Sequence, residues 1–210
     1  MAWIVLCAYI GWLALAFARQ TWRQYRRTGD TGLRISPRPG SAQWWAKLLF
    51  IAALLSCTAG PVADIAGATT GPVAVPTLTP HPVVAGIGLA LIAASIVATP
   101  IAQIAMGSSW RVGVDPDERT RLVTRGPFRM VRNPIFTLVT ALPLGAVLAV
   151  PNAVSAAGLL LLVAAVQIQV RAVEEPYLLR THGQAYRDYA AKVGRFLPCI
   201  GRLTPPTAPR

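Results

Sequence analysis

The sequence predicts an all-α integral membrane protein with about five transmembrane helices and a C-terminal cytoplasmic amphipathic helical segment. Composition is the first observation behind this prediction. Of the 210 residues, 54% are hydrophobic and only 13% are charged, whereas about a quarter of a typical soluble domain is charged. The other two observations are a set of five apolar blocks and a one-sided placement of the basic residues. The 3 cysteines are far apart and predict neither a disulfide framework nor a metal site.

Five apolar blocks are long enough, or nearly long enough, to cross the bilayer core, which takes roughly 20 residues of helix. These blocks cover residues 2–18, 44–63, 83–106, 135–150 and 153–170. The first block has no basic segment before it and therefore predicts a membrane anchor rather than a cleaved signal peptide. Pro151 and Asn152 separate the last two blocks, so a short helical hairpin is expected over residues 135–170.

The basic residues predict the orientation of these helices. All 20 Lys and Arg fall into three segments, with 7 in residues 19–47, 6 in 111–132 and 7 in 171–210. Five spans place these segments on one face, which the positive-inside bias makes cytoplasmic, with the N-terminus outside. Because this topology accounts for most of the net charge of +12, nucleic-acid binding is not predicted. A high content of Ala, Arg, Gly and Pro favours a bacterial plasma membrane.

The chain divides into three predicted parts. Residues 1–106 form three transmembrane helices with their loops, residues 107–203 form a core with the cytoplasmic loop, the hairpin and a cytoplasmic helix, and residues 204–210 form a disordered tail. The connection over 60–82 is rich in Pro, Thr and Gly and is expected to lack regular structure. Small residues at every fourth position of the third block predict a helix-packing stripe, formed by Gly86, Ala90, Ala94 and Ala98.

Two polar segments flank the hairpin and could carry chemistry. The first, GPFRMVRNPIF over residues 126–136, places Asn133 as an N-cap and Pro134 in the first turn of the fourth span. Arg129 and Arg132 are three residues apart and share a face if this turn is helical. Contact with lipid headgroups would explain both arginines. The alternative is that they face a ligand.

The second segment follows the fifth span and begins with Glu174 and Glu175. Two carboxylates at a bilayer edge need cationic partners, and Arg171 is close enough in sequence to serve as one. Pro176 is expected to break the helix there. Since the hairpin brings both segments to the same depth, the carboxylates and the arginines can converge. Such a site suits a ligand that has both a carboxylate and an ammonium group, as S-adenosyl-L-methionine does.

Taken together, these motifs resemble the isoprenylcysteine carboxyl methyltransferase family, and phospholipid methyltransferases share much of the pattern. The resemblance rests on LVTRGPFRMVRNPIF, then a short two-span hairpin, then AVEEPYLLRTHGQAYRDYAAKVGRFLP. It covers roughly the C-terminal 90 residues, and its pieces are specific only as a set. The resemblance implies a membrane-embedded methyltransferase that uses S-adenosyl-L-methionine. The acceptor would be a hydrophobic small molecule or lipid that reaches the site from the bilayer.

The resemblance also implies site residues. Those expected to bind the cofactor are Gly126, Pro127, Phe128, Arg129, Arg132, Asn133, Pro134, Glu174, Tyr186 and Arg195. Glu175 and Arg171 are the expected catalytic residues, with Glu175 as the base if the acceptor must lose a proton. No metal is expected. Two positions depart from the family pattern, because Asn133 replaces the usual histidine and Phe136 the usual tyrosine.

Two other classes remain open from the sequence. A membrane reductase of related architecture would use NADPH, but no glycine-rich dinucleotide motif is present in the sequence. A non-catalytic membrane scaffold is the other alternative. The sequence does not determine whether the acceptor atom is oxygen, nitrogen or sulfur, nor the oligomeric state.

Overall fold

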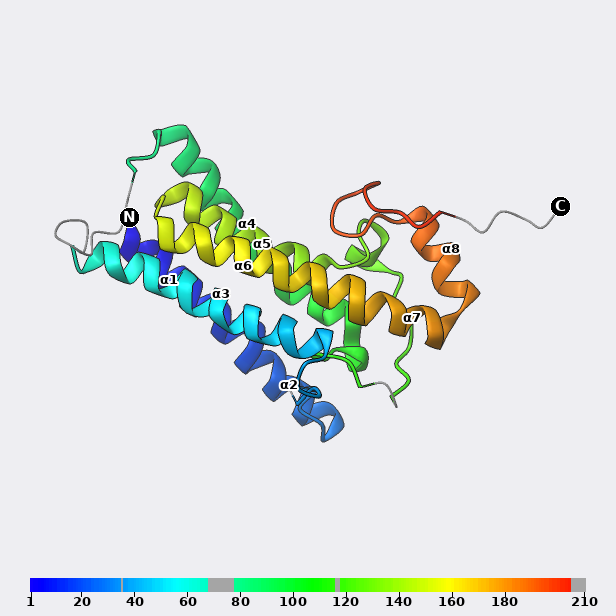
Figure 1. Ribbon diagram of the computed structural model, residues 1–210. Coiled ribbons are helices and arrows are strands. Elements are labelled where there is room, and N and C mark those ends of the chain that lie inside the picture. The colour runs from blue at the N-terminus through cyan, green and yellow to red at the C-terminus, as the bar shows by residue number, and fades with distance from the viewer. Residues whose placement is uncertain (35, 68–77, 116–117, 205–210) are drawn as a thin grey trace.

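The computed structural model describes residues 1–34, 36–67, 78–115 and 118–204, and these residues form helices without a β-sheet (Figure 1). The predicted tail lies almost wholly outside them, as do residues 68–77 of the outer connection. Four helices are long and apolar enough to cross a membrane, namely Ala2–Thr28, Ala42–Ile65, Pro82–Ser109 and Ala153–His182. A shorter apolar helix covers Pro134–Ala149. The predicted set of five spans is therefore present as four long helices and one short one.

The first helix is longer than predicted. It contains α1 (Ala2–Leu13), a π-helical turn over Ala14–Arg19, and α2 (Gln20–Thr28). Arg19 does not end it, because a charged residue at a membrane surface can extend into water while the backbone stays helical. The helix ends at Gly29, whose φ of 73° is left-handed and which closes the last turn.

The remaining helices follow the predicted order. They are α3 (Ala42–Ile65), α4 (Pro82–Met106), α5 (Pro134–Ala149), α6 (Ala153–Ile168), α7 (Glu175–His182) and α8 (Gln184–Lys192). The prediction that the outer connection lacks regular structure from residue 60 was wrong, because α3 continues through Pro61 to Ile65. Pro61 is tolerated near the end of α3, where few backbone hydrogen bonds remain to be lost.

Pro176 does not break the helix, contrary to the prediction. A π-helical turn over Gln169–Glu174 joins α6 to α7 without interruption. Because a π turn is wider than an α turn, it relieves the clash between the proline ring and the preceding carbonyls. The chain changes direction only at Gly183, which has a φ of 51° and separates α7 from α8.

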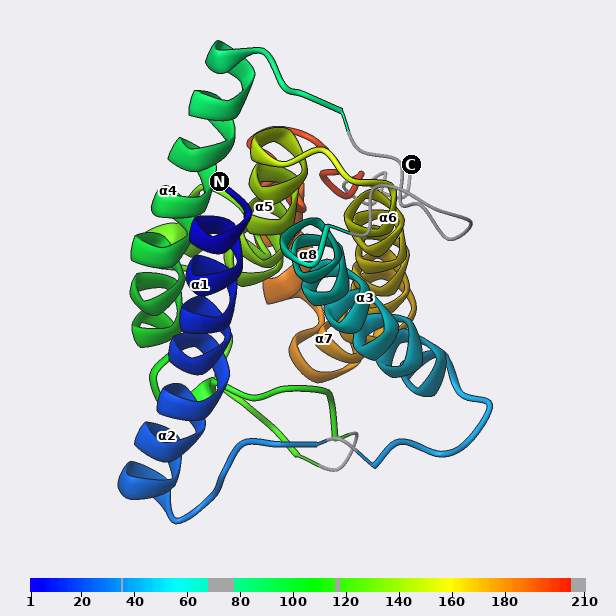
Figure 2. The same cartoon turned by 90° about the vertical axis from the view of Figure 1, so that its left-hand side faces the viewer.

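The spans pack as two main helix pairs, α3 with α6 and α4 with α5, while α1 contacts both α3 and α4 (Figure 2). Glycines permit the close approach within each pair. A Cβ on Gly88 of α4 would lie 2.5 Å from the carbonyl oxygen of Gly145 of α5, and a Cβ on Gly158 of α6 would lie 2.8 Å from the Cys57 sulfur of α3. The backbones therefore meet where no side chain intervenes.

The stripe predicted for α4 does not face α5, its main partner among the described helices. Gly86 has open space around its Cα, and Ala90 and Ala94 are exposed, whereas Gly88 is buried against α5. The sequence contains small residues on several faces of this helix, so their spacing alone does not select one face.

Replacing Gly88 with alanine is expected to lower the free energy of unfolding by about 1–3 kcal/mol, because the added methyl group meets backbone atoms that cannot move aside. Gly86→Ala in the same helix is the matched control and should be neutral or slightly stabilising, since alanine is the better helix former and nothing lies within 4 Å. Thermal unfolding of both variants in one detergent measures the difference. Equal midpoints would contradict the packing described.

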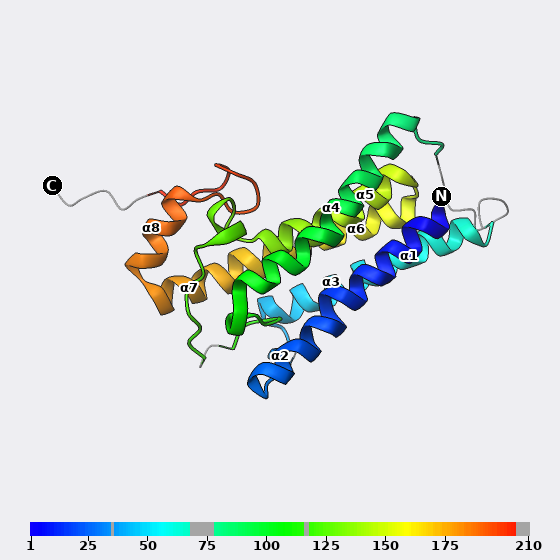
Figure 3. The ribbon, with the colours of Figure 1, turned by 180° about the vertical axis from the view of Figure 1, so that it is seen from behind.

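The helices alternate in direction and so separate the connections into two groups (Figure 3). The N-terminus, the last turn of α3, the first turn of α4 and the α5–α6 connection are at one end of the bundle. The α2–α3 connection, the segment between α4 and α5, α7 and α8 are at the other end (Figure 1). We call it the basic end because the described Lys and Arg residues lie in these segments or in the adjoining ends of helices. This arrangement matches the predicted one-sided charge.

Candidate active site

A cavity of about 270 Å³ opens within the basic end of the bundle, close to the lower limit of about 300 Å³ for small-molecule sites. Its inner part, between the spans, is apolar and is lined by Phe17, Phe50, Phe136 and Val139. Its outer part is polar and is lined by side chains that include Arg34, Arg111, Arg132, Asn133, Gln169 and Glu174. One continuous space therefore joins a lipid-like interior to a charged mouth.

Arg132 and Glu175 form a buried ion pair beside this cavity. The Arg132 Nη2 donates to Glu175 Oε1 at 2.5 Å, and the two side chains are only 1% and 9% exposed. Arg195 donates to both oxygens of the same carboxylate, at 2.7 and 2.9 Å, and its pKa is raised mainly by this hydrogen bonding. The predicted convergence of the two polar segments is confirmed for Arg132 and Glu175.

Arg132 also holds the C-terminal segment against the bundle. Its guanidinium donates to the backbone carbonyls of Ala190, Val193 and Gly201. The backbone N–H of Arg132 donates to the Gly194 carbonyl, and the backbone N–H and side chain of Asn133 both donate to the Arg195 carbonyl. Within the described residues, the buried Nε of Arg132 is left without a hydrogen-bond partner. Arg132 therefore lines the cavity with one of its donors unused.

Glu174 and Glu175 are neighbours but have different surroundings. Glu174 lines the cavity and accepts a hydrogen bond from Gln169, which lies at the other end of the same π turn, at 3.3 Å. Glu175 does not line the cavity, and both of its oxygens accept hydrogen bonds from arginines. These contacts favour a structural role for Glu175 over the expected role of catalytic base.

Two tyrosines of α8 complete the polar part of the cavity. Tyr186 is 1% exposed and lies 6.0 Å under the Arg132 guanidinium, close enough for a cation–π contact. Tyr189 donates from its hydroxyl to the Phe128 carbonyl at 2.6 Å, and burial raises its pKa to about 12. Burial also raises the pKa of Tyr186, so both hydroxyls stay protonated at physiological pH.

The expected site residues divide into two sets. Those that line the cavity are Phe128, Arg132, Asn133, Pro134, Glu174 and Tyr186. Those that do not are Gly126, Pro127, Arg129, Arg171, Glu175 and Arg195. Asn133 occupies the N-cap position of α5, but its side chain does not cap the helix and instead donates to Arg195.

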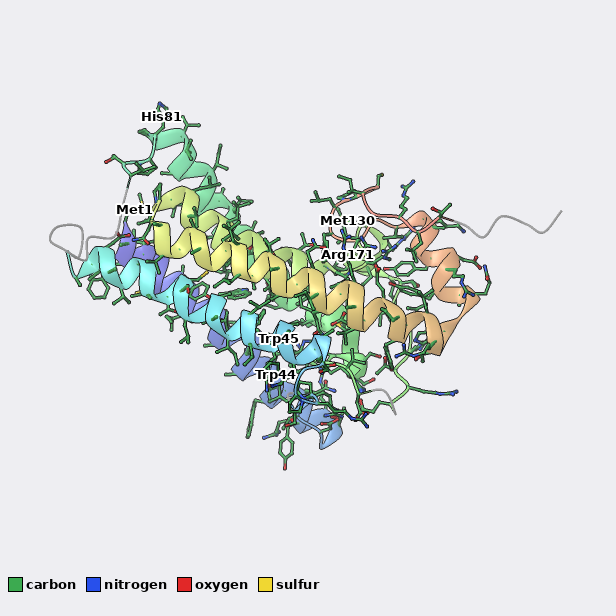
Figure 4. The ribbon with its side chains drawn as sticks, viewed as in Figure 1. Met1, Trp44, Trp45, His81, Met130 and Arg171 are labelled. Carbon is green, nitrogen blue, oxygen red and sulfur yellow. The ribbon has the colours of Figure 1, made fainter. Side chains whose placement is uncertain are left out.

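Arg129 and Arg171 are both exposed at the surface, and Arg171 is labelled in Figure 4. The expected pairing of Arg171 with the carboxylates of 174 and 175 is absent from the described ion pairs, since Arg132 and Arg195 reach Glu175 instead. Arg171 precedes Glu175 by four residues, but its side chain is exposed whereas that of Glu175 is buried.

Several residues of the cavity were not expected from the sequence. Gln103 and Gln169 both line the cavity and lie near the ends of otherwise apolar spans. A polar residue at such a position could have indicated from the sequence that a polar site lies there. Arg34 and Arg111 gave no such signal, because they lie in separate basic segments and meet only in the folded chain. Trp44 and Trp45, at the start of α3, also lie at the basic end (Figure 4), a position typical of aromatic anchors at a membrane interface.

A multi-pass helical bundle with an amphiphilic cavity at one end is the architecture of an integral membrane protein with a small-molecule site. A sequence model of the family described as phospholipid methyltransferase matches residues 83–185, a stretch that includes α4 to α7 and most of the lining of the cavity. No curated protein matches the chain significantly. Residues 83–185 therefore belong to the phospholipid methyltransferase family, and the protein is an integral membrane methyltransferase that uses S-adenosyl-L-methionine.

The residues of the cavity fit this cofactor. The cofactor carries a sulfonium, an ammonium and a carboxylate, and the cavity offers a carboxylate at Glu174, aromatic faces at Tyr186 and Phe128, and the unpartnered buried Nε of Arg132. A carboxylate and aromatic faces attract cations, and an arginine N–H suits an anion. The donor set is therefore complementary to all three charged groups.

Proposed function

We propose that this protein transfers a methyl group to a lipid-like acceptor at the cytoplasmic face of the membrane, with the N-terminus outside. The observation that supports this most directly is the cavity, which joins an apolar interior between the spans to a polar mouth containing Glu174. The family match supports a phospholipid as the acceptor. The collected basic residues at the mouth support the cytoplasmic assignment of that end.

The proposed roles of the residues follow from their contacts. S-adenosyl-L-methionine, when bound, supplies an activated methyl group on a sulfonium. Glu174 attracts the cationic part of the ligand, Arg132 Nε holds an anionic oxygen, and Tyr186 packs against the same ligand. Phe17, Phe50 and Phe136 exclude water and hold the apolar part of the acceptor.

The proton of an amine acceptor would be taken by Glu174 rather than by Glu175. A general base must reach the substrate with a free lone pair. Among the described residues, Glu174 lines the cavity and accepts one hydrogen bond, whereas Glu175 is bonded by Arg132 and Arg195. Arg195 and Glu175 then act by positioning Arg132. The roles of Gly126, Pro127 and Arg129 are limited to the backbone conformation of the segment that leads into α5.

Binding of S-adenosylhomocysteine to the detergent-purified protein tests this proposal, with NADPH titrated in parallel by calorimetry. We expect micromolar binding of S-adenosylhomocysteine, weakened by Glu174→Gln, and no binding of NADPH. Binding of NADPH but not S-adenosylhomocysteine to well-folded protein would overturn the proposal and favour a membrane reductase.

A further inference from the structure

Two arginines from distant parts of the chain converge on one carboxylate at the mouth of the cavity. Arg34 follows the first span and Arg111 follows α4, and both form ion pairs with Glu118. Asp30 also accepts from Arg34, which holds the pKa of Asp30 well below its usual range. We call Arg34 and Arg111 the arginine pair. Arg34 lies outside the residues matched by the family model.

The backbone around the arginine pair is fixed by hydrogen bonds between the two segments. The N–H of Arg34 donates to the Val112 carbonyl at 2.8 Å, and the N–H of Val112 donates to the Gly32 carbonyl at 2.8 Å. A Cβ on Gly113 would lie 2.4 Å from the Arg34 carbonyl oxygen, so the two segments are in direct contact. The two guanidinium groups are therefore held near each other before any ligand binds.

Glu118 can leave the arginine pair by rotation of its side chain alone. The Tyr177 hydroxyl donates to the backbone carbonyl of Glu118 at 2.5 Å and fixes that backbone. The carboxylate side chain is 29% exposed and so has room to turn toward solvent. The Glu118 carboxylate can therefore be replaced by another anion, while the backbone that carries the arginine pair stays in place.

The arginine pair is part of the cavity wall and can donate a further hydrogen bond. Arg34 and Arg111 both line the cavity, and the buried Nε of Arg111 has no hydrogen-bond partner among the described residues. Burial lowers the pKa of Arg111, with the nearby charge of Arg34 as the next cause. The negative charge of an anion bound to the arginine pair would offset the repulsion between the two guanidinium groups. Lys47 and Asp115 line the same region and bring one charge of each sign.

We propose that the arginine pair binds the phosphate of the acceptor's headgroup and that Glu118 occupies the pair when no acceptor is bound. Forked guanidinium groups match the oxygens of a phosphate, which suits two arginines better than a single carboxylate does. The apolar interior of the cavity then receives the lipid chains and the mouth receives the headgroup. This assignment rests on the proposed function, which it deepens by naming how the headgroup is recognised.

Calorimetric titration of short-chain lipids into the purified protein, in the presence of S-adenosylhomocysteine, tests the assignment. The probes are dioctanoyl phosphatidylethanolamine, dioctanoylglycerol, which lacks the phosphate, and inorganic phosphate alone. Arg111→Gln is expected to weaken binding of the phospholipid by about 10- to 100-fold, as for a lost hydrogen bond between charged groups. Glu118→Gln should strengthen it by about two- to fivefold, because the competing anion is gone.

The controls separate binding from folding. Arg38→Gln changes an exposed arginine of the same N-terminal segment and should leave every affinity unchanged. Dioctanoylglycerol should bind all variants alike. The assignment is overturned if Glu118→Gln and Arg111→Gln both weaken phospholipid binding, or if the loss for dioctanoylglycerol equals that for the phospholipid.

Two further outcomes are informative. Binding of inorganic phosphate as tight as that of the phospholipid would show a site for free phosphate and would overturn the lipid assignment. If wild-type protein does not bind S-adenosylhomocysteine, the proposed function is contradicted. Opposite effects of Glu118→Gln and Arg111→Gln on the affinity for the phospholipid would still identify a phosphate site. The two failures are therefore distinguishable.

Discussion

Arg132→Ala is expected to lower the free energy of unfolding by about 3–5 kcal/mol, because it leaves the buried carboxylate of Glu175 with one cationic partner fewer. The variant also loses the donors that hold the carbonyls of Ala190, Val193 and Gly201. The C-terminal segment should therefore detach from α5. We expect binding of S-adenosylhomocysteine to be lost together with the thermal stability of the purified protein.

Arg129→Ala provides the matched control for this prediction. Arg129 lies three residues earlier in the same segment and is exposed, and surface substitutions of this kind usually change stability by less than about 0.5 kcal/mol. Both variants are compared by thermal unfolding in the same detergent and by calorimetry. If Arg132→Ala unfolds at the wild-type temperature, the buried ion pair does not hold the C-terminal segment.

Glu174→Gln should remove methyl transfer while leaving the fold intact. The side chain keeps its size and can still accept a hydrogen bond from Gln169. It loses the negative charge on the cavity wall, so affinity for the cationic cofactor should fall by about tenfold or more. If Glu174 also takes a proton from the acceptor, kcat should fall by a further factor of about 100 or more.

Asp188→Asn is the control for Glu174→Gln, since Asp188 is an exposed carboxylate on α8 that contacts only Gln184 among the described residues. Its affinity for S-adenosylhomocysteine should equal that of wild type. So should its rate of transfer of a labelled methyl group to phosphatidylethanolamine in vesicles. Glu175→Gln should instead resemble Arg132→Ala and lose stability. If Glu175→Gln is stable but inactive and Glu174→Gln is active, the roles proposed for the two carboxylates are reversed.

The convergence of Arg132 and Glu175 could be predicted from the sequence for a physical reason. A helical hairpin returns the chain to the same membrane depth, so polar residues that flank it on both sides must lie near each other. The sequence did not show which carboxylate faces the cavity. The π turn over Gln169–Glu174 decides this, because a wider turn changes the face on which each later side chain lies.

Hydrophobicity and charge are local properties, so the sequence by itself determined the apolar spans, the side on which the basic segments gather and the motifs that resemble a methyltransferase. Only the tertiary structure decided that α4 meets α5 at Gly88 rather than at Gly86, and that Arg129 and Arg171 are exposed while Arg132 is buried. It also decided that Arg34 and Arg111, which are 77 positions apart in the chain, share Glu118. Such contacts depend on the packing of helices against one another, and no periodicity or composition within a single segment encodes them.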